Sequence, residues 1–301
     1  MRQHTVAPNV VTFNAASSAC EKGLQWRHAA ALLPEMRQGR LRPNKITYAT
    51  VVSACEKGER WDWALEFLAE MRWSGVEADI VAYNAGISAC ASGECWELAL
   101  GLLRQIGEAG LEPDLISYSA AIGACEKGQH WEQAFALFGE ACARGLTLDA
   151  RVFAATLSAC ATGRRWEDAL GLIAEMRAAG LEASLVAHGA AASACGRSRR
   201  WPQALALLEE AKLHDLAPDV LMYNTVLDAC AKSGQWEWAL ELFDEMRLQD
   251  VAMDVVTCGI AISACEAGHH WTGALALLSE LRQQDLAPDA VAYCAAISAC
   301  E

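Results

Sequence analysis

The chain has 301 residues, of which 53% are hydrophobic and 21% charged, and its formal net charge is −14. It has no apolar run of about 18 residues, which excludes a membrane-spanning helix. The acidic balance disfavours nucleic acid as a partner, because phosphate backbones attract basic surfaces.

In chain order, the sequence repeats one pattern without insertion or deletion. Trp26 and Trp61 are 35 residues apart, and tryptophan keeps this spacing as far as Trp271. A fixed period of this length is typical of a solenoid, in which each repeat packs only on its neighbours. We therefore predict a single solenoid domain over residues 1–301, with repeats at 10–44, 45–79, 80–114, 115–149, 150–184, 185–219, 220–254 and 255–289 and a partial repeat at 290–301.

Each repeat predicts two helices, as the second one illustrates. The first helix spans residues 45–57, Gly58 interrupts it, and the second runs from Trp61 to about Ser74. Apolar residues recur at spacings of three and four in both helices, and Gly75 ends the second. The predicted core residues are Tyr48, Val51, Val52 and Cys55 in the first helix, and Trp61, Ala64, Leu65, Leu68 and Met71 in the second.

The residue before each repeat carries a side-chain oxygen that can cap the first helix. These residues are Asn9, Asn44, Asp79, Asp114, Asp149, Ser184, Asp219, Asp254 and Asp289. Two helices per repeat, short turns and no strands predict an all-α fold, a right-handed α-solenoid of helix-turn-helix repeats.

Nine of the 13 cysteines occupy one column of the repeat. Equivalent positions in stacked helices lie roughly 8–10 Å apart, whereas a disulfide needs Cα atoms about 4.4–6.8 Å apart. We therefore predict reduced, buried thiols that act as small apolar residues. The column comprises Cys20, Cys55, Cys90, Cys125, Cys160, Cys195, Cys230, Cys265 and Cys300.

Several stretches resemble pentatricopeptide repeats of the P type: residues 10–14 (VVTFN), residues 236–246 (WEWALELFDEM) and residues 217–219 (APD). The resemblance covers residues 10–301, and the 35-residue period fits this family better than the 34-residue tetratricopeptide pattern. The sequence departs from the usual motif in the tryptophan that opens every second helix, where an aliphatic residue is common. We expect this tryptophan column to pack in the core.

The resemblance implies selective binding of single-stranded RNA in a chloroplast or mitochondrion, for RNA processing, stability or translation, with one base per repeat. In the family, an aliphatic residue at position 2 of the repeat clamps the base. Ordinary core packing at a helix start is the alternative role of this column. Arg151 interrupts the column, which otherwise comprises Val11, Ile46, Val81, Ile116, Val186, Leu221 and Val256.

The resemblance also implies that positions 5 and 35 together select the base. The pairs are Asn14 with Asn44, Ala49 with Asp79, Asn84 with Asp114, Ser119 with Asp149, Ala154 with Ser184, Gly189 with Asp219, Asn224 with Asp254, and Gly259 with Asp289. The first pair suggests a pyrimidine, the two Asn–Asp pairs uracil, and the Ser–Asp pair a purine. Alanine and glycine have no side chain that can bond a base edge. Capping alone is the alternative role of the position-35 residues.

A basic column closes the first helices, at Lys22, Lys57, Lys127, Arg197 and Lys232. These side chains can contact phosphates, and they also suit a helix C-terminus for dipole reasons. Part of the acidity lies elsewhere, in a glutamate column on the second helices: Glu35, Glu70, Glu140, Glu175, Glu210, Glu245 and Glu280.

Signals for catalysis are weak. Residues 130–132 (HWE) imitate the His-x-Glu of zinc deaminases, but the Cys-x-x-Cys that such a site needs is absent. We expect no enzyme activity, no cofactor, no metal, no membrane partner and no small-molecule substrate. The alternative function is a protein-interaction scaffold whose acidic surface binds a basic protein. The pattern starts and stops close to both ends, which is typical of a piece of a longer protein, and the residues before it are too few for a targeting peptide.

Overall fold

The computed structural model describes residues 8–249, 251–283 and 290–300. Within these ranges the chain forms seventeen α-helices and no strand, which confirms the predicted all-α solenoid fold. Contacts within the chain divide it into two compact halves, residues 1–148 and 149–301. The single solenoid domain over residues 1–301 stays a prediction.

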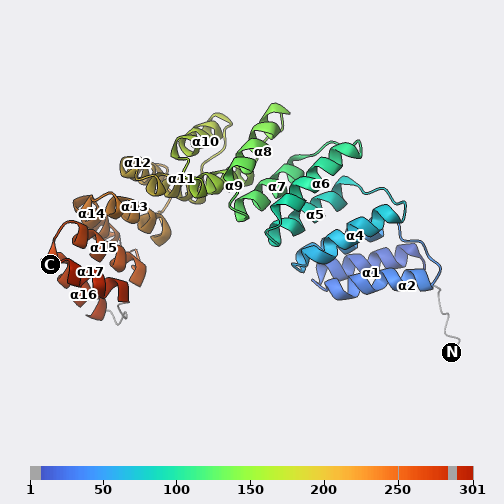
Figure 1. Cartoon of the computed structure of the whole chain (residues 1–301), viewed down its shortest axis with the longest axis horizontal. Coiled ribbons are helices and arrows are strands. Elements are labelled where there is room, and N and C mark those ends of the chain that lie inside the picture. Colours follow the sequence, from blue (N-terminus) through green and yellow to red (C-terminus); the bar gives the residue numbers. More distant parts are fainter. Residues whose placement is uncertain (1–7, 250, 284–289, 301) are drawn as a thin grey trace. The chain divides into compact units, whose positions relative to one another are not determined.

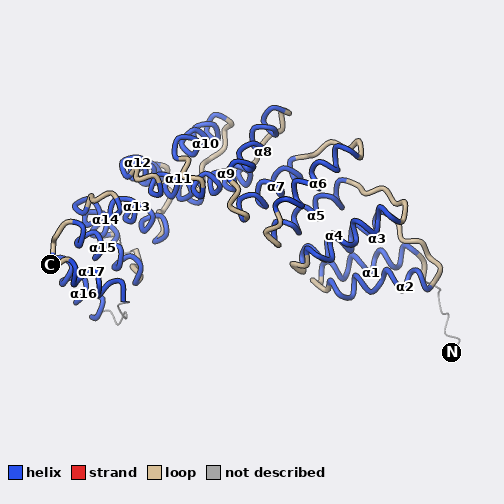
Figure 2. The backbone as a smooth tube through the Cα atoms, in the orientation of Figure 1, coloured by secondary structure: helices blue, strands red, loops and turns tan. Residues whose placement is uncertain are grey.

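The helices alternate in the predicted order, with short loops between them (Figures 1 and 2). The first helices of the repeats are α1 (Val10–Lys22), α3 (Lys45–Lys57), α5 (Ile80–Ser92), α7 (Leu115–Lys127), α9 (Ala150–Thr162), α11 (Leu185–Arg197), α13 (Val220–Lys232), α15 (Val255–Ala267) and α17 (Ala290–Ser298). The second helices are α2 (Trp26–Gln38), α4 (Trp61–Trp73), α6 (Trp96–Glu108), α8 (Trp131–Ala143), α10 (Trp166–Ala178), α12 (Trp201–Leu213), α14 (Trp236–Leu248) and α16 (Trp271–Gln283).

Within each half, first helices pack on first helices and form one layer. Each second helix packs on its own first helix, and on the first helix of the next repeat wherever that repeat belongs to the same half. The core lies between the layers. In the second repeat it contains the predicted first-helix residues, together with Ala64, Leu68 and Met71. Trp61 and Leu65 are only half-buried, and Phe67 is buried instead, because the buried stripe lies slightly to one side of the predicted one.

Side chains at position 35 cap the first helices, as predicted. In all eight caps within the described ranges, a side-chain oxygen accepts a hydrogen bond from the backbone N–H three residues later. Asp289 lies outside the described residues. At the other end of the repeat, Gly75 follows α4 with φ +70°, in the left-handed region that glycine adopts without a steric penalty.

Tryptophans of the column cover the junctions between repeats. The Trp61 ring covers Gly93 at the end of the next first helix so closely that a Cβ at Gly93 would lie 2.2 Å from Cδ1 of Trp61. At four junctions the residue before one tryptophan contacts the ring of the preceding tryptophan: Arg60 on Trp26, with its guanidinium carbon 4.9 Å from the ring centroid, His130 on Trp96, Arg200 on Trp166 and His270 on Trp236. The rings are half-buried except that of Trp271, which is exposed. They therefore pack between repeats rather than deep in the core.

The cysteine column is reduced throughout. Seven of its nine members are buried, and burial raises the pKa of Cys55 to about 12 and that of Cys125 to about 11. The prediction of burial is wrong for two members, since Cys20 is half-buried and Cys300 is exposed. Both lie in the outermost described repeats, where a first helix has a neighbour on one side only.

Candidate nucleic-acid interface

The aliphatic residues at position 2 lie on the surface of the first helices. Their exposed fractions range from 51% for Ile46 to 73% for Leu221. Core packing is therefore the wrong interpretation for all seven members: Val11, Ile46, Val81, Ile116, Val186, Leu221 and Val256. Exposed apolar side chains that recur once per repeat mark an interaction surface, because single exposed residues would be scattered.

Position 5 follows one helical turn after position 2, so both residues share a face of the first helix. The side chains of Asn84 and Asn224 are nonetheless buried, and that of Asn14 is half-buried. Each amide thus lies below the exposed aliphatic side chain of its own helix, at the junction with the next repeat. One repeat supplies the amide and the next supplies the helix N-terminus that it contacts.

The third junction shows the geometry most completely. The Nδ2 group of Asn84 donates a hydrogen bond to Oδ1 of Asp114, at 3.1 Å. Oδ1 of Asn84 lies 2.6 Å from the hydroxyl of Ser117, which can donate to it. The same Asp114 oxygen caps α7 by accepting from the Ser117 backbone N–H at 2.9 Å. The predicted selecting pair is therefore in direct contact.

The first repeat has the same arrangement with an amide in place of the carboxylate. Asn14 Nδ2 donates to Oδ1 of Asn44 at 3.4 Å, and the Thr47 hydroxyl donates to Oδ1 of Asn14 at 2.6 Å. Oδ1 of Asn44 also accepts from the Thr47 backbone N–H. Because its oxygen is occupied, the Nδ2 group of Asn44 remains as a donor.

The seventh repeat differs in one contact. Asn224 Nδ2 donates to Oδ1 of Asp254 at 3.3 Å. The Thr257 hydroxyl bonds Asp254 at 2.8 Å, as the hydroxyls of Ser117 and Thr47 bond Asp114 at 2.9 Å and Asn44 at 3.0 Å. Oδ1 of Asn224 is buried without a hydrogen-bond partner within the described part of the chain.

The aspartates of these pairs are ionised at neutral pH. Burial favours the neutral form of Asp114, but hydrogen bonds from the Ser117 backbone and hydroxyl and from Asn84 outweigh it and lower the pKa. The same balance, with Thr257 and Asn224 as donors, lowers the pKa of Asp254. Each carboxylate can therefore only accept hydrogen bonds.

The remaining selecting pairs have fewer polar groups that could bond a base. Ala49, which is buried, and Ala154, Gly189 and Gly259 present no polar side chain. Arg151, the exception in the aliphatic column, is exposed and pairs with Asp149. The pair of Ser119 with Asp149 spans the two halves and stays a prediction, as does the pair of Gly259 with Asp289, which is outside the described residues.

All five members of the basic column are exposed. Lys57 is bound to Glu21 of the preceding repeat at 2.8 Å, and Lys232 to Asp228 of its own helix at 2.6 Å. Lys22, Lys127 and Arg197 have no ion pair within the described ranges. The column lies eight residues beyond position 5, about 12 Å along the helix.

The glutamate column on the second helices is largely neutralised. Arg37 pairs with Glu70, Lys212 with Glu245 at 2.5 Å, and Arg247 with Glu280 at 3.6 Å, each across one junction. A tyrosine at position 4 adds a hydrogen bond to two of these glutamates, from Tyr48 to Glu70 at 2.9 Å and from Tyr223 to Glu245 at 3.0 Å. These ion pairs join second helices of adjacent repeats.

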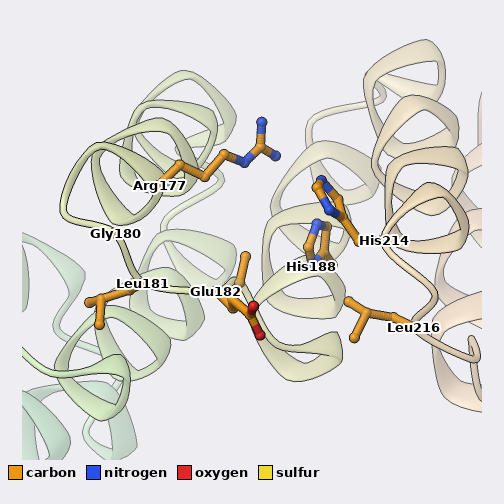
Figure 3. A pocket seen from close by; sticks show the side chains of 8 residues that line it. Arg177, Gly180, Leu181, Glu182, His188, His214 and Leu216 are labelled. Carbon is orange, nitrogen blue, oxygen red and sulfur yellow. The ribbon is translucent and has the colours of Figure 1, made fainter.

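One pocket lies beside a repeat that has no tyrosine at position 4. His188 replaces the tyrosine at position 4 of the sixth repeat and is buried beside His214, with Arg177 on the opposite side of a pocket of about 330 Å³ (Figure 3). Its Nδ1 group donates to the Ser184 carbonyl at 3.1 Å. Its Nε2 atom has no hydrogen-bond partner within the described residues and lies 3.6 Å from Glu210. The pocket is lined by the loops that follow α10 and α12, together with His188 of α11 and Arg177 of α10.

Neither a metal site nor a membrane-spanning helix is found in the part of the chain that the structure describes. No three His, Cys, Asp or Glu side chains lie together so as to hold a metal ion. No helix there is long and apolar enough to cross a bilayer.

The fold and this surface define a class of protein, the helical-hairpin repeat solenoid, here with an asparagine amide at three of its junctions. Sequence models confirm the resemblance: the pentatricopeptide repeat domain matches residues 1–57 and 66–127, the PPR repeat residues 46–76, 116–146 and 153–181, and the PPR repeat family residues 218–267. The chain belongs to the pentatricopeptide repeat family. No curated protein matches the sequence significantly.

Solved structures share the fold at low sequence identity. The chain is similar to the pentatricopeptide repeat protein PPR10 from maize, with a TM-score of 0.55 and 20% identity over 99% of this chain and 48% of that one. PPR10 in complex with an 18-nt psaJ RNA element gives a TM-score of 0.55 at 19% identity, over 99% of this chain and 53% of that one. The chain thus spans about half the length of PPR10.

A shorter match involves a different relative. The PPR domain of Arabidopsis thaliana protein-only RNase P 1, in complex with tRNA, gives a TM-score of 0.53 at 15% identity. That match covers 58% of this chain and 92% of that domain. At these identities the comparisons establish the fold.

Proposed function

We propose that this protein binds single-stranded RNA selectively, through the exposed face of its first helices. The observation that carries the proposal is the alignment, in the first, third and seventh repeats, of an exposed aliphatic side chain with a polar pair at the junction below it. An aliphatic surface can hold the face of a base, while the polar pair bonds its edge. Two pentatricopeptide relatives of the same fold are described in complex with RNA, which supports the proposal.

Each junction would favour a base through the hydrogen-bonding capacity that remains free. Asp114 and Asp254 can only accept, so they favour the N3–H of uracil over the N3 acceptor of cytosine. Asn44 keeps a free donor and favours a pyrimidine that presents an acceptor. Asn84 and Asn224 are four repeats apart, so three bases should separate the two selected uracils.

The protein would act by occupying RNA rather than by catalysis. Covering a transcript segment can protect it, expose a neighbouring segment or recruit another factor. We place this activity in organellar RNA processing, stability or translation, in a chloroplast or mitochondrion. The resemblance of the repeats to organellar pentatricopeptide proteins supports this placement.

The test is selection from a pooled single-stranded RNA library, followed by binding measurements with the selected RNA and its single-base variants. Wild type should prefer U over C at the base facing Asn224. Asn224→Ala should lose about 1 kcal/mol of that preference, which is the net value of one hydrogen bond. Leu221→Ala, on the same helix, should weaken binding to all four bases equally.

A protein-interaction scaffold is the second candidate, because two features favour it. The net charge of −14 suits a basic partner, and the second helices expose large apolar side chains, including Trp73 at 90% and Leu248 at 87%. If the library yields no enriched sequence, or if Asn224→Ala leaves the base preference unchanged, base selection is wrong and this candidate gains support.

A further inference from the structure

Two of the three selecting asparagines are contacted by a hydroxyl side chain that lies outside the selecting pairs. In both junctions this side chain belongs to position 3 of the following repeat. Ser117 lies 2.6 Å from Oδ1 of Asn84, and Thr47 lies at the same distance from Oδ1 of Asn14. Thr257 occupies the equivalent position after Asn224, but its hydroxyl bonds Asp254, and Oδ1 of Asn224 has no hydrogen-bond partner within the described residues.

In the repeats that follow another repeat, a hydroxyl residue at position 3 occurs only after an asparagine at position 5. Three repeats carry Asn at position 5, and each is followed by Thr or Ser at position 3 of the next repeat. The other five carry Ala, Ser or Gly at position 5, and none is followed by a hydroxyl residue. Their following residues are Ala82, Val152, Ala187, Met222 and Ala292.

Helix capping does not require these hydroxyls. The caps at Asp79, Asp149, Ser184 and Asp219 lack a hydroxyl at position 3, yet each accepts from the backbone of its helix. The hydroxyl does complete a capping box at Asn44, Asp114 and Asp254, and also at Asn9 with Thr12. Thr12 has no preceding repeat amide within the described residues, so it shows the capping role by itself.

The hydroxyl gives the asparagine amide a second hydrogen bond. The carboxylate of Asp114 accepts only, so the NH₂ end of Asn84 must face it, and the oxygen end is left for the Ser117 hydroxyl. With both ends held, the amide presents one fixed arrangement of its remaining hydrogen and lone pair. With one end held it can rotate and exchange donor for acceptor.

We propose that Thr47 and Ser117 are positioning residues for base selection, each orienting the asparagine amide of the preceding repeat. The proposal rests on the proposed RNA binding and adds a third member to the pairs at positions 5 and 35. Selection would then require three side chains from two repeats. A repeat with Asn at position 5 but no hydroxyl after it would bind RNA with little discrimination between uracil and cytosine.

The first experiment removes the hydroxyl. Ser117→Ala is compared with wild type by fluorescence anisotropy, using the selected RNA with U or C at the base facing Asn84. Loss of one hydrogen bond should reduce the U-over-C ratio about fivefold, while binding to an RNA varied at the base facing Asn224 stays unchanged. Ser117→Thr should restore the ratio. Thr12→Ala breaks a matching capping box and should leave every base preference as in wild type.

The second experiment introduces the asparagine and the hydroxyl at a junction that has neither. Ala49→Asn places an amide beside Asp79, and Ala82→Ser adds the hydroxyl. The double variant should gain a U-over-C preference at the base facing the second repeat, about fivefold above that of Ala49→Asn alone. Ala82→Ser alone should gain none.

The outcomes separate the inference from the proposed function. Wild type that binds no RNA would overturn both. Wild type that prefers U at Asn84, together with a Ser117→Ala variant that keeps the full preference, would overturn the positioning role alone. An equal loss of affinity for U and C in folded Ser117→Ala would also overturn it, because that result indicates a capping effect.

Discussion

At the residue scale, the sixth repeat shows how one substitution changes a recurring contact. Tyr48, Tyr118 and Tyr223 each donate a hydroxyl hydrogen bond to the glutamate at position 26 of their own repeat. His188 meets the equivalent Glu210 at 3.6 Å with an unprotonated nitrogen, because its Nδ1 proton is donated to Ser184. The sixth repeat therefore lacks a bond that three others make.

We expect His188→Tyr to stabilise the protein by about 1–2 kcal/mol at pH 7, because it restores a hydrogen bond to a charged acceptor. Urea unfolding followed by circular dichroism measures this. Tyr223→Phe removes the equivalent hydroxyl from the seventh repeat and should destabilise. An unchanged midpoint in His188→Tyr would contradict the expectation.

The effect of His188→Tyr should also depend on pH. Burial, with Arg177 and His214 nearby, lowers the pKa of His188 below its ordinary value near 6.5. The unfolded chain then binds more protons than the folded one, so wild type loses stability as the pH falls below about 6.5. The advantage of His188→Tyr should widen between pH 7 and pH 5.5, and a constant difference would indicate that His188 does not titrate there.

At the element scale, the contact between the second helix of one repeat and the first helix of the next depends on a tryptophan and a glycine. Trp26, Trp61, Trp96 and Trp236 each cover the glycine that ends the next first helix. Two repeats carry Ser198 and Ser233 at this glycine position, so the fold tolerates a small side chain there. The contact thus adjusts the helix packing without deciding whether the repeat folds.

Two glycine substitutions should have opposite effects. Gly93→Ala places a methyl group 2.2 Å from the Trp61 ring and should destabilise by about 1–3 kcal/mol, the usual cost of overpacking. Gly101→Ala, within α6, meets nothing within 4 Å and should stabilise by about 0.5–1 kcal/mol through helix propensity. Thermal unfolding of both variants measures the signs, and a stabilising Gly93→Ala would show that the ring is not held there.

At the scale of the whole molecule, the net charge of −14 opposes the proposed ligand. Ion pairs across the junctions neutralise several second-helix glutamates, and three members of the basic column remain without an ion pair in the described residues. Affinity for RNA should therefore come mainly from apolar and hydrogen-bonding contacts, with a small electrostatic share.

We expect a shallow salt dependence. Three to five phosphate contacts give a slope of log affinity against log salt near −2 to −3.5 for a single strand. Lys127→Gln should make the slope shallower by about 0.7, whereas Glu21→Gln, which releases Lys57 from its ion pair, should steepen it by about the same amount. Equilibrium binding across a salt series measures the slopes. Identical slopes in all three proteins would place the phosphates away from this column.

The sequence by itself determined the helices and their order. The 35-residue period, the caps from Asn9 onward and the glycines after the second helices are local signals, because capping and helix termination depend on neighbouring residues. The cysteine and tryptophan columns predicted stacked repeats because they recur with a fixed 35-residue period. The contact of Asn84 with Asp114 was anticipated only through the family resemblance.

The tertiary structure decided which periodic residues are buried and which are exposed. Helical periodicity predicts that Ile46 and Val51 belong to one helix, but it does not predict which of them is buried. The packing of two neighbouring repeats determines which face of the helix is covered. That packing leaves the position-2 column in solvent, half-buries Trp61 and brings Ser117 to the amide of Asn84. Contacts between residues 33 positions apart in the chain depend on how one repeat docks on the next, and no local pattern encodes that geometry.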